Sequence, residues 1–348
     1  MNQIIQEDLD FILSNNLPWE SFFGKTVLIS GANGLLPSYL VETLLYLNQK
    51  NLGTSVKVIG IVRNIEKAKV RFKSYENRSD LVLINQDICE PIQYDKPVDY
   101  IIHAASQASP KYYGLDPVGT LNANIIGTKN LLEFARKNNP MSEFLLFSSG
   151  EVYGVTHDSN HMIKESDYGY IDPTNVRSCY AESKRMAETM CICWSHQYGI
   201  SVKIVRPFHT YGPMMLPDDG RVFADFVFDI VNNRNIVMKS DGSTKRVFCY
   251  ISDATIGFFT VLLKGKIREA YNVAGNAEVS ILELANLLID LFPEKNLKLI
   301  REIRTDNNHY LVSPIQYHFP DTSKLKQLDW NTRYTLNDGF KRTIESYL

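Results

Sequence analysis

Tyr180 and Lys184 stand four residues apart in the stretch Arg-Ser-Cys-Tyr-Ala-Glu-Ser-Lys that starts at Arg177. On a helix this spacing puts both side chains on one face, one turn apart. A phenol normally loses its proton at about pH 10. A neighbouring ammonium group, together with the positive charge of a hydride acceptor in its oxidised form, lowers that pKa toward neutral pH. Ser149 follows an apolar strand and can donate a hydrogen bond to the same phenol oxygen. The three side chains predict acid–base chemistry, in which a hydroxyl loses its proton while hydride leaves its carbon.

A Tyr-x-x-x-Lys pair alone is common on solvated helix faces, so the surrounding elements decide its meaning. A β-rich run at residues 25–30 leads into Gly31-Ala-Asn-Gly34-Leu35, and residues 36–47 then repeat apolar side chains at helical spacing. A strand, a glycine turn and a helix in this order form the arrangement that binds a pyrophosphate through backbone N–H groups. A plain turn that binds no ligand can have the same sequence. Pro37 replaces the third glycine of such turns, and a helix tolerates proline in its first turn.

Further apolar runs predict strands at residues 56–62, 81–85, 100–103, 144–148 and 202–205. They alternate with helical patterns, including 120–137 and 178–198, which predicts a Rossmann-type α/β fold: a doubly wound parallel sheet with helices on both faces. A smaller C-terminal α/β subdomain follows. We expect a lead-in helix at 1–22, a mainly dinucleotide-binding domain at 23–206 and a mainly substrate-binding subdomain at 207–348, with some elements returning to the core.

Arg63 occupies the end of the second strand, where an acidic residue would hold the ribose hydroxyls of NAD. A cation at this place can face a 2′-phosphate, which keeps NADP open, or it can be a solvated surface charge.

The net charge of −2 argues against a nucleic-acid surface. The five cysteines are scattered, which predicts reduced thiols in a cytoplasmic protein rather than disulfides or a metal site. No signal peptide and no apolar run of membrane-spanning length is visible.

Several short sequence motifs occur together in the order typical of one enzyme family. They are Gly31-Ala-Asn-Gly34, His103-Ala-Ala, Asn124-x-x-Gly127-Thr128, Ser148-Ser149, Tyr180-x-x-x-Lys184, Arg206-Pro207, Tyr211-Gly-Pro213 and Pro320-Asp321. On these residues the chain, over about 24–330, resembles the extended short-chain dehydrogenases/reductases of the NAD-dependent nucleotide-sugar epimerase/dehydratase family. The resemblance implies bound NAD, a nucleotide-diphosphate sugar as substrate, and oxidation at sugar C4 to a 4-keto intermediate.

Within the family, four short stretches of the sequence are similar to those of UDP-glucuronate decarboxylases. They are Ala108-Ser-Pro110, Glu151-Val-Tyr-Gly154, Arg177-Ser-Cys-Tyr180 and Lys245-Arg246. That resemblance implies that Tyr180 is the base at the 4-hydroxyl and that Lys184 tunes it and holds the nicotinamide ribose. It implies that Ser149 orients the 4-hydroxyl, that Glu151 and Arg246 border C5, and that Arg221 contacts the diphosphate.

The remaining site residues also come from the resemblance. The implied cofactor site consists of Gly31, Asn33, Gly34, Leu35, Arg63, Asp87, Ile88, Ala104, Ala105, Asn124, Ser148, Tyr180, Lys184 and Pro207. The implied substrate site consists of Ser106, Ser149, Gly150, His209, Arg221, Val222, Arg246 and Tyr317.

Three positions depart from the family pattern. Gly150 stands where decarboxylases have Ser and 4,6-dehydratases have Asp, so it cannot protonate a departing C6 hydroxyl. His209 replaces the usual Asn, and Tyr317 stands where arginine usually meets the diphosphate. UDP-glucuronate decarboxylation is the first expectation, followed by a sugar epimerase and a 4,6-dehydratase. A non-catalytic dinucleotide-binding regulatory protein is the alternative outside enzymology.

The family also implies a homodimer joined by a four-helix bundle of the 120–137 and 178–198 helices. Met186, Met190, Ile192 and Trp194 give the second helix more apolar surface than one core-facing side needs.

Overall fold

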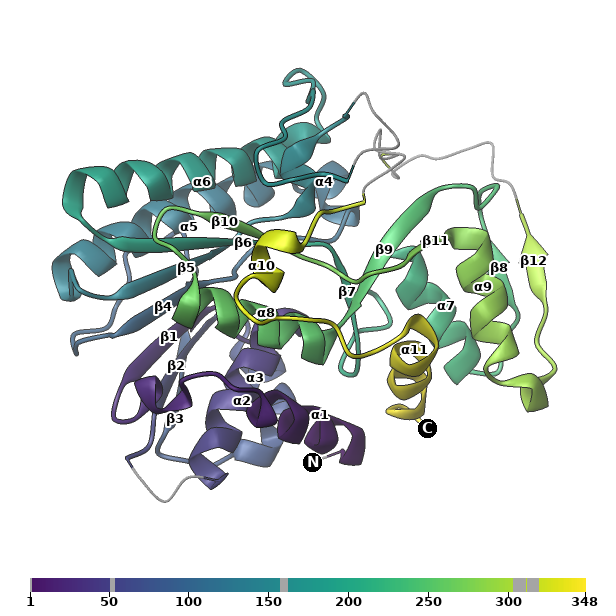
Figure 1. Cartoon of the computed structure of the whole chain (residues 1–348), viewed down its shortest axis with the longest axis horizontal. Coiled ribbons are helices and arrows are strands. Elements are labelled where there is room, and N and C mark those ends of the chain that lie inside the picture. Colours follow the sequence, from purple (N-terminus) through teal and green to yellow (C-terminus); the bar gives the residue numbers. More distant parts are fainter. Residues whose placement is uncertain (1, 51–53, 157–161, 303–310, 312–318) are drawn as a thin grey trace.

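The computed structural model describes residues 2–50, 54–156, 162–302, 311 and 319–348. Its main element is a seven-stranded sheet with the order β10-β6-β5-β4-β1-β2-β3 (Figure 1). All neighbouring strands in it are parallel. The predicted doubly wound Rossmann-type sheet is confirmed. Its strands are β1 (Thr26–Ser30), β2 (Lys57–Val62), β3 (Leu81–Asn85), β4 (Tyr100–His103), β5 (Glu143–Phe147), β6 (Ser201–Pro207) and β10 (Ala270–Val273).

Helices cover both faces of this sheet because its strands are apolar on both sides. In β1, Val27 and Ile29 pack in one cluster with residues of α2 and α8, whereas Leu28 packs in the other with residues of α5 and α6. The helices are α2 (Leu35–Lys50), α8 (Ile251–Lys264), α5 (Pro117–Asn138) and α6 (Ser178–Tyr198), with the short α3 (Ile65–Arg71) and α4 (Lys111–Leu115) between strands.

Helix α5 starts three residues earlier than the sequence pattern predicts. Asp116 caps it by accepting the Gly119 N–H at 3.0 Å, and Pro117 occupies the first helical position. The cap and the proline, rather than apolar periodicity, set this end.

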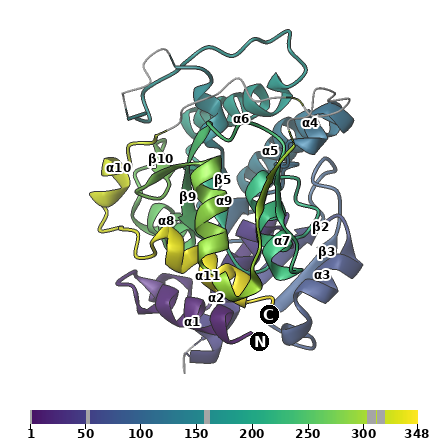
Figure 2. The ribbon, with the colours of Figure 1, turned by 90° about the vertical axis from the view of Figure 1, so that its right-hand side faces the viewer.

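A second group of smaller elements lies beside the carboxyl ends of β5 and β6 (Figures 1 and 2). A three-stranded sheet has the order β11-β9-β7, and β8 pairs with β12 in parallel. The elements are β7 (His209–Tyr211), α7 (Val222–Val231), β8 (Ile236–Met238), β9 (Lys245–Tyr250), β11 (Glu278–Ser280), α9 (Ile281–Asp290), β12 (Leu299–Arg301) and α11 (Leu336–Glu345). The short helix α10 (Ser323–Lys326) lies against β10 of the large sheet, where Lys324 Nζ donates to the Ala270 carbonyl oxygen at 2.8 Å. Since β10 returns to the large sheet, the chain crosses between the two regions more than once.

The expected single helix over residues 1–22 is two elements. Helix α1 (Gln3–Ser14) ends before Pro18, and a 3₁₀ turn, η1 (Trp19–Phe22), follows. Figures 1 and 2 show the two chain ends side by side, and Asn2 Nδ2 donates to the Ser346 carbonyl oxygen at 3.1 Å.

A buried carboxylate fixes α1 to three other elements. Asp8 has no exposed surface and accepts from Tyr39 Oη on α2 (3.1 Å), Tyr250 Oη at the end of β9 (2.8 Å) and Arg342 Nη2 on α11 (2.9 Å). One side chain therefore joins the N-terminal helix to the large sheet's helices and to the smaller group.

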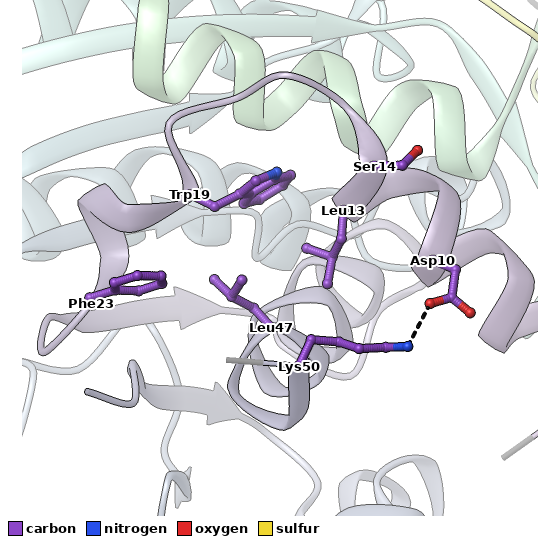
Figure 3. Close-up of a pocket in the computed structure, with 7 residues that line it drawn as sticks. All are labelled: Asp10, Leu13, Ser14, Trp19, Phe23, Leu47 and Lys50. Atoms are coloured by element: carbon purple, nitrogen blue, oxygen red, sulfur yellow. Dashed lines mark ion pairs between the residues drawn. The ribbon is translucent and has the colours of Figure 1, made fainter. Parts of the chain in front are cut away.

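A cavity of about 400 Å³ lies between α1, the 14–23 segment and the end of α2 (Figure 3). It is lined by Asp10, Leu13, Ser14, Trp19, Phe23, Leu47 and Lys50. Phe23 precedes β1 and Lys50 ends α2, so the cavity belongs to the amino edge of the sheet, away from the catalytic side chains. No helix among the described residues is both long and apolar enough to cross a membrane.

Candidate active site

The glycine turn after β1 lies directly against the end of β4. Gly31 has φ +67°, and a Cβ atom on it would lie 2.8 Å from the Ala105 Cα atom. Only glycine meets both conditions. The Ala104 and Ala105 N–H groups both donate to Ser30 Oγ at 3.1 Å. Because the sheet order reverses between β1 and β4, this bare backbone floor is the place where a dinucleotide binds in such folds.

The rim of this floor carries the other predicted cofactor residues. Asn33 is half-buried, and Gly34 and Leu35 lead into α2, whose N–H groups open toward the turn. Asp87 accepts the Cys89 N–H at 2.8 Å, while Ile88 is buried against Gly127 of α5. Hydrogen bonds from Gln107 and from the Gly119 N–H lower the pKa of Asp116, and the charge of the exposed Arg63 adds to this. Arg63 therefore stands near the start of α5.

Polar atoms without partners line the inner side of the same region. Ser30 Oγ already accepts two N–H groups, so it donates its own proton to His103 Nδ1 at 2.8 Å. Burial lowers the pKa of His103 to about 3, which leaves a neutral ring with its proton on Nε2. Among the described residues, His103 Nε2, Asn124 Oδ1 and Ser106 Oγ are buried without a hydrogen-bond partner. Orphaned polar atoms around a backbone cradle fit a polar ligand such as a dinucleotide.

Ser149, Tyr180 and Lys184 come together as predicted. Ser149 follows β5 and caps the 3₁₀ turn η3 (Gly150–Tyr153), where its Oγ accepts the Glu151 N–H at 3.2 Å. Its side chain also hydrogen-bonds Tyr180. Lys184 Nζ donates to the Phe147 carbonyl oxygen at 2.7 Å and lies 5.8 Å from the centre of the Tyr180 ring.

The protein's own groups do not by themselves lower the phenol pKa, and the predicted lowering also counted on the positive charge of an oxidised cofactor. Burial raises the pKa of Tyr180 to about 12, although the hydrogen bond from Ser149 and the charge of Arg221 lower it. Burial also lowers the pKa of Lys184 to about 7, against the carboxylate of Glu188, which raises it. Desolvation outweighs the ammonium because Lys184 Nζ is bonded to a strand carbonyl rather than to the phenol oxygen.

The carboxylate of Glu151 is held by an arginine and not by backbone amides. Arg177 Nη1 lies 2.9 Å from Oε2 and Nη2 lies 3.1 Å from Oε1. The charge of Glu151 reaches the phenol, since it raises the pKa of Tyr180. Glu151 is therefore an oriented group of the site.

Gly150 faces the ring of Phe208. A Cβ atom at Gly150 would lie 2.8 Å from Phe208 Cε1 and 2.9 Å from Cζ. A serine or aspartate at this position could enter only if the buried Phe208 ring moved. The absence of a side chain at Gly150 therefore leaves the room that the Phe208 ring occupies.

The other predicted substrate residues lie on the smaller group. Arg221 caps α7 and pairs with Asp219 (Nη2–Oδ2 2.7 Å), close enough to Tyr180 to lower its pKa. Val222 is exposed at the start of α7, and the ring of His209 packs against Phe223 and Phe248. Arg246 on β9 donates to the Lys245 carbonyl at 2.8 Å. Pro207 ends β6, and Tyr317 lies outside the described residues.

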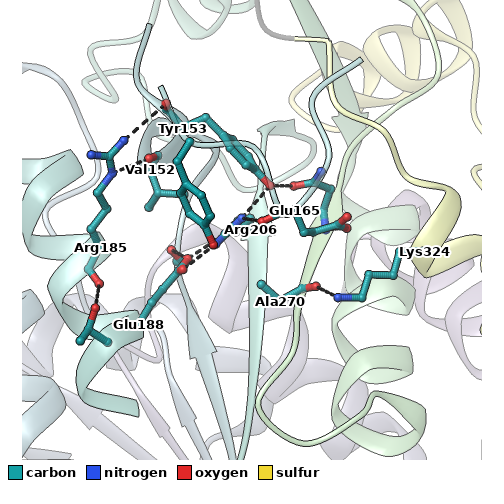
Figure 4. A network of polar contacts seen from close by, with 12 residues as sticks. Val152, Tyr153, Glu165, Arg185, Glu188, Arg206, Ala270 and Lys324 are labelled. Atoms are coloured by element: carbon teal, nitrogen blue, oxygen red, sulfur yellow. Dashed lines mark hydrogen bonds and ion pairs between the residues drawn. The ribbon is translucent and has the colours of Figure 1, made fainter. Parts of the chain in front are cut away.

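Ser148 turns its side chain away from the cofactor floor. Its Oγ donates to Glu188 Oε1 at 2.5 Å, and its N–H donates to the Val205 carbonyl. Glu188 in turn receives Arg206 Nε at 2.9 Å and Nη2 at 2.7 Å, and Arg206 Nη1 donates to Tyr153 Oη (Figure 4). Ser148 is thus one end of a buried network that locks β5, β6 and α6 together.

Three side chains of the site had no assigned role in the sequence analysis. Tyr113 on α4 stacks on Tyr180, with ring centres 4.9 Å apart and planes at 16°. Glu188 and Arg177 act on Lys184 and Glu151. The spacing Tyr180, Lys184, Glu188, each four residues on, was a usable signal for Glu188. No local pattern marks Tyr113, because it comes from a distant element.

Comparison with known proteins agrees with this geometry. Residues 27–274 match the NAD dependent epimerase/dehydratase family. UDP-glucuronic acid decarboxylase 3 of Arabidopsis thaliana is 34% identical over 323 residues, which is 92% of this chain and 88% of the plant protein. UDP-glucuronic acid decarboxylase 1 of Danio rerio is 33% identical, over 93% of this chain and 72% of its own length.

Solved structures share the fold at lower identity. The UDP-glucuronic acid 4-epimerase of Bacillus cereus, in complex with UDP-glucuronic acid and NAD, superposes with a TM-score of 0.76 at 23% identity, over 92% of this chain and 98% of its own. A dTDP-glucose 4,6-dehydratase of Bacillus anthracis in complex with NAD has a TM-score of 0.74 at 20% identity, over 93% and 96%. By its matched residues, its parallel sheet and its Ser149–Tyr180–Lys184 site, the chain belongs to the NAD dependent epimerase/dehydratase family.

Proposed function

We propose that this protein is a nucleotide-sugar enzyme that oxidises its substrate at C4 with bound NAD, and that it decarboxylates UDP-glucuronate. The observation that carries the proposal is the convergence of Ser149, Tyr180 and Lys184 at the carboxyl edge of the sheet, beside the glycine turn. The similarity to plant and fish UDP-glucuronic acid decarboxylases over more than nine-tenths of the chain selects the substrate.

The residues fit the cofactor. Gly31, Gly34, Ala104 and Ala105 offer backbone without side-chain obstruction, and the unpartnered Asn124 Oδ1 and Ser106 Oγ can take polar contacts. Bound NAD supplies an acceptor for hydride and returns it later. We choose NAD over NADP, since Arg63 is a single exposed side chain near Asp116 rather than a closed phosphate site.

In the first step, Tyr180 takes the proton of the sugar 4-hydroxyl as hydride leaves C4, and the product is a 4-keto sugar. Ser149 orients the hydroxyl through its bond to the same phenol. The pKa of Tyr180 stays high even with Arg221 nearby, so further positive charge is needed to make it a base, and the oxidised nicotinamide ring of NAD would supply that charge.

In the second step, the C4 ketone takes up the electron pair as the C5 carboxylate leaves as carbon dioxide. Tyr180, now protonated, returns its proton to the oxygen at C4 as negative charge develops there. A proton from solvent adds at C5 while the oxygen gives its proton back to Tyr180, which restores the ketone. Return of hydride to C4 and of the Tyr180 proton to the oxygen completes the pentose. Gly150 offers no acid for loss of a C6 hydroxyl, which disfavours the 4,6-dehydratase reaction.

The test is to incubate the purified protein with UDP-glucuronate, UDP-glucose and dTDP-glucose and to follow products by NMR and mass spectrometry. Carbon dioxide and UDP-xylose from UDP-glucuronate support the proposal. A product of unchanged mass identifies an epimerase and loss of water a dehydratase, and either result would overturn decarboxylation. Silence with every sugar would favour the regulatory, non-catalytic alternative.

The assembly and organisation belong to the same proposal. We keep the division into an N-terminal segment (1–22) that contains α1 and η1, a mainly cofactor-binding domain (23–206) and a mainly substrate-binding subdomain (207–348), from which β10 returns to the large sheet. Val118 and Ile126 on α5 and Met186 on α6 are exposed apolar residues on two adjacent helices, which supports a homodimer through a four-helix bundle. All five cysteines are free thiols, which fits the cytoplasm.

A further inference from the structure

Arg177 makes a two-pronged charge pair close to the catalytic side chains. It is the residue before α6, three positions before Tyr180, and its guanidinium meets Glu151 through two parallel contacts of 2.9 and 3.1 Å. The Arg177 and Glu151 side chains are only 10% and 26% exposed. A planar fork of this kind fixes the position of a carboxylate in a way that the single ammonium of lysine cannot.

The same guanidinium lies against the catalytic tyrosine's neighbour. Its central carbon is 5.7 Å from the centre of the Tyr113 ring, and Tyr113 stacks on Tyr180. Tyr113 is 2% exposed, and its hydroxyl donates to the Ala108 carbonyl at 3.1 Å. Arg177 thus contacts both the carboxylate next to Ser149 and the ring behind Tyr180.

Stability alone does not explain such a pair. Removing two charges from water costs free energy, and their mutual attraction offsets this cost only in part. A buried pair can therefore often be replaced by apolar groups without loss of stability. What a buried, two-pronged pair secures is one arrangement of its members.

We propose that Arg177 is a positioning residue of this active site. It holds the Glu151 carboxylate, as an anion, on the C5 side of the sugar, and it keeps Tyr113 packed behind Tyr180. It acts on the reaction through these two side chains and not by binding the sugar. The inference rests on the proposed nucleotide-sugar chemistry.

The charges around Tyr180 give the inference a pH signature. The groups around Tyr180 are Ser149 before η3, Glu151 of η3, Tyr113 of α4, Cys179 and Lys184 of α6, and Arg221 before α7. Arg177 lies behind them, against Tyr113 and paired with Glu151. The carboxylate of Glu151 raises the pKa of Tyr180. Without Arg177 that charge loses its counterion, so the phenol becomes harder to ionise and the acid limb of the rate profile moves to higher pH. In a variant without the Glu151 charge, the acid limb of the rate profile moves to lower pH.

The experiment compares Arg177→Gln, Arg177→Lys, Glu151→Gln and the Arg177→Gln/Glu151→Gln double variant with the parent protein. Steady-state rates, the pH profile, calorimetric affinity for the nucleotide sugar and thermal melting are measured for each. A single-turnover assay follows absorbance of the reduced cofactor, which forms before carbon dioxide is lost and keeps Glu151→Gln measurable. Arg234→Gln is the matched control, because the Arg234 side chain is 62% exposed just after α7 and pairs with Asp229 of that helix.

We expect Arg177→Gln to lower kcat by roughly 10–100-fold with KM changed less than about 3-fold, and Arg177→Lys to recover only part of the loss. In the Glu151→Gln background the arginine substitution should cost less than about 2-fold more, because its partner is already gone. Arg234→Gln should match the parent.

Additive losses in the double variant, or a KM that rises and an affinity that falls in the Arg177 variants while kcat holds, would mean that Arg177 binds the sugar itself and would overturn the inference. So would an unshifted pH profile with parental rates. In each of these outcomes the parent is active, so the proposed function stands. A parent that turns over no nucleotide sugar removes both.

Discussion

At the scale of single residues, Tyr180 is the group on which the chemistry depends. Tyr180→Phe keeps the ring that stacks on Tyr113 and removes only the hydroxyl that Ser149 contacts. We expect kcat to fall by about 10²–10⁴-fold, the usual contribution of a positioned acid–base group, with unchanged melting temperature. Single-turnover absorbance of the reduced cofactor measures the step directly.

Tyr113→Phe is the control for that variant, because it keeps the same stack and loses only the bond to the Ala108 carbonyl. It should retain most of the activity. Equal losses in both variants would contradict the assignment of the proton transfer to Tyr180.

Gly150 gives a second prediction at this scale, one of shape. Gly150→Ser places a Cβ atom within 3 Å of the Phe208 ring, so we expect it to destabilise the protein by about 1–3 kcal/mol, the usual cost of overpacking. Adding Phe208→Leu should recover much of that loss, since the smaller side chain makes room. Urea denaturation measures both; a Gly150→Ser protein as stable as the parent would show that the ring moves freely.

At the scale of elements, the attachment of α1 depends on Asp8. Asp8→Ala leaves Tyr39, Tyr250 and Arg342 without their common acceptor, and we expect a loss of roughly 2–4 kcal/mol in the free energy of unfolding. Asp10→Ala is the control on the same helix, because Asp10 forms an exposed pair with Lys50 and should cost less than about 1 kcal/mol.

The same carboxyl makes the loss depend on pH. Burial raises the pKa of Asp8 from 3.8 to about 6, although Arg342, Tyr250 and Tyr39 each lower it. The folded chain therefore holds a proton that the unfolded chain releases between these values. The stabilisation from this protonation is full below pH 3.8 and is lost as pH rises through about 6. The gap between parent and Asp8→Ala should widen as pH falls from about 6 to about 4; a constant gap in denaturation curves would contradict the assigned pKa.

Elements with strong local signals were predictable from the sequence. The catalytic helix has the predicted bounds of 178–198, and the strand–turn–helix around Gly31 is where the pattern puts it. The start of α5 was missed because a capping aspartate and a proline, not periodicity, determine it. The break after Ser14 was missed because apolar residues continue beyond the helix end.

Within the site, the sequence could predict which side chains meet, but not their pKa shifts or their hydrogen-bond partners. Ser149, Tyr180 and Lys184 meet because two motifs lie at adjacent strand and helix ends. Three other contacts depend on side-chain packing between elements. They are those of Lys184 with the Phe147 carbonyl, of Ser148 with Glu188, and of Arg177 with Glu151. A single sequence carries no local signal for such contacts.

At the scale of the whole molecule, the proposed dimer gives a further prediction. Ile126→Glu with Met186→Glu puts two carboxylates on the exposed apolar surface of α5 and α6, where both side chains are more than a third exposed. A charge that must be buried between copies opposes association, so we expect a monomer by light scattering after size exclusion. Val70→Glu, on the 77% exposed Val70 of α3, is the control. A double variant that stays dimeric would place the interface elsewhere.

Asp8 and Arg342 meet in the folded molecule although 334 residues separate them in the sequence. The polar surroundings of Asp8 are therefore completed only after Arg342 has been synthesised. Since both ends emerge at one place, remote from the catalytic groups, a short peptide linking them and a new opening in a surface loop would leave the catalytic machinery in register.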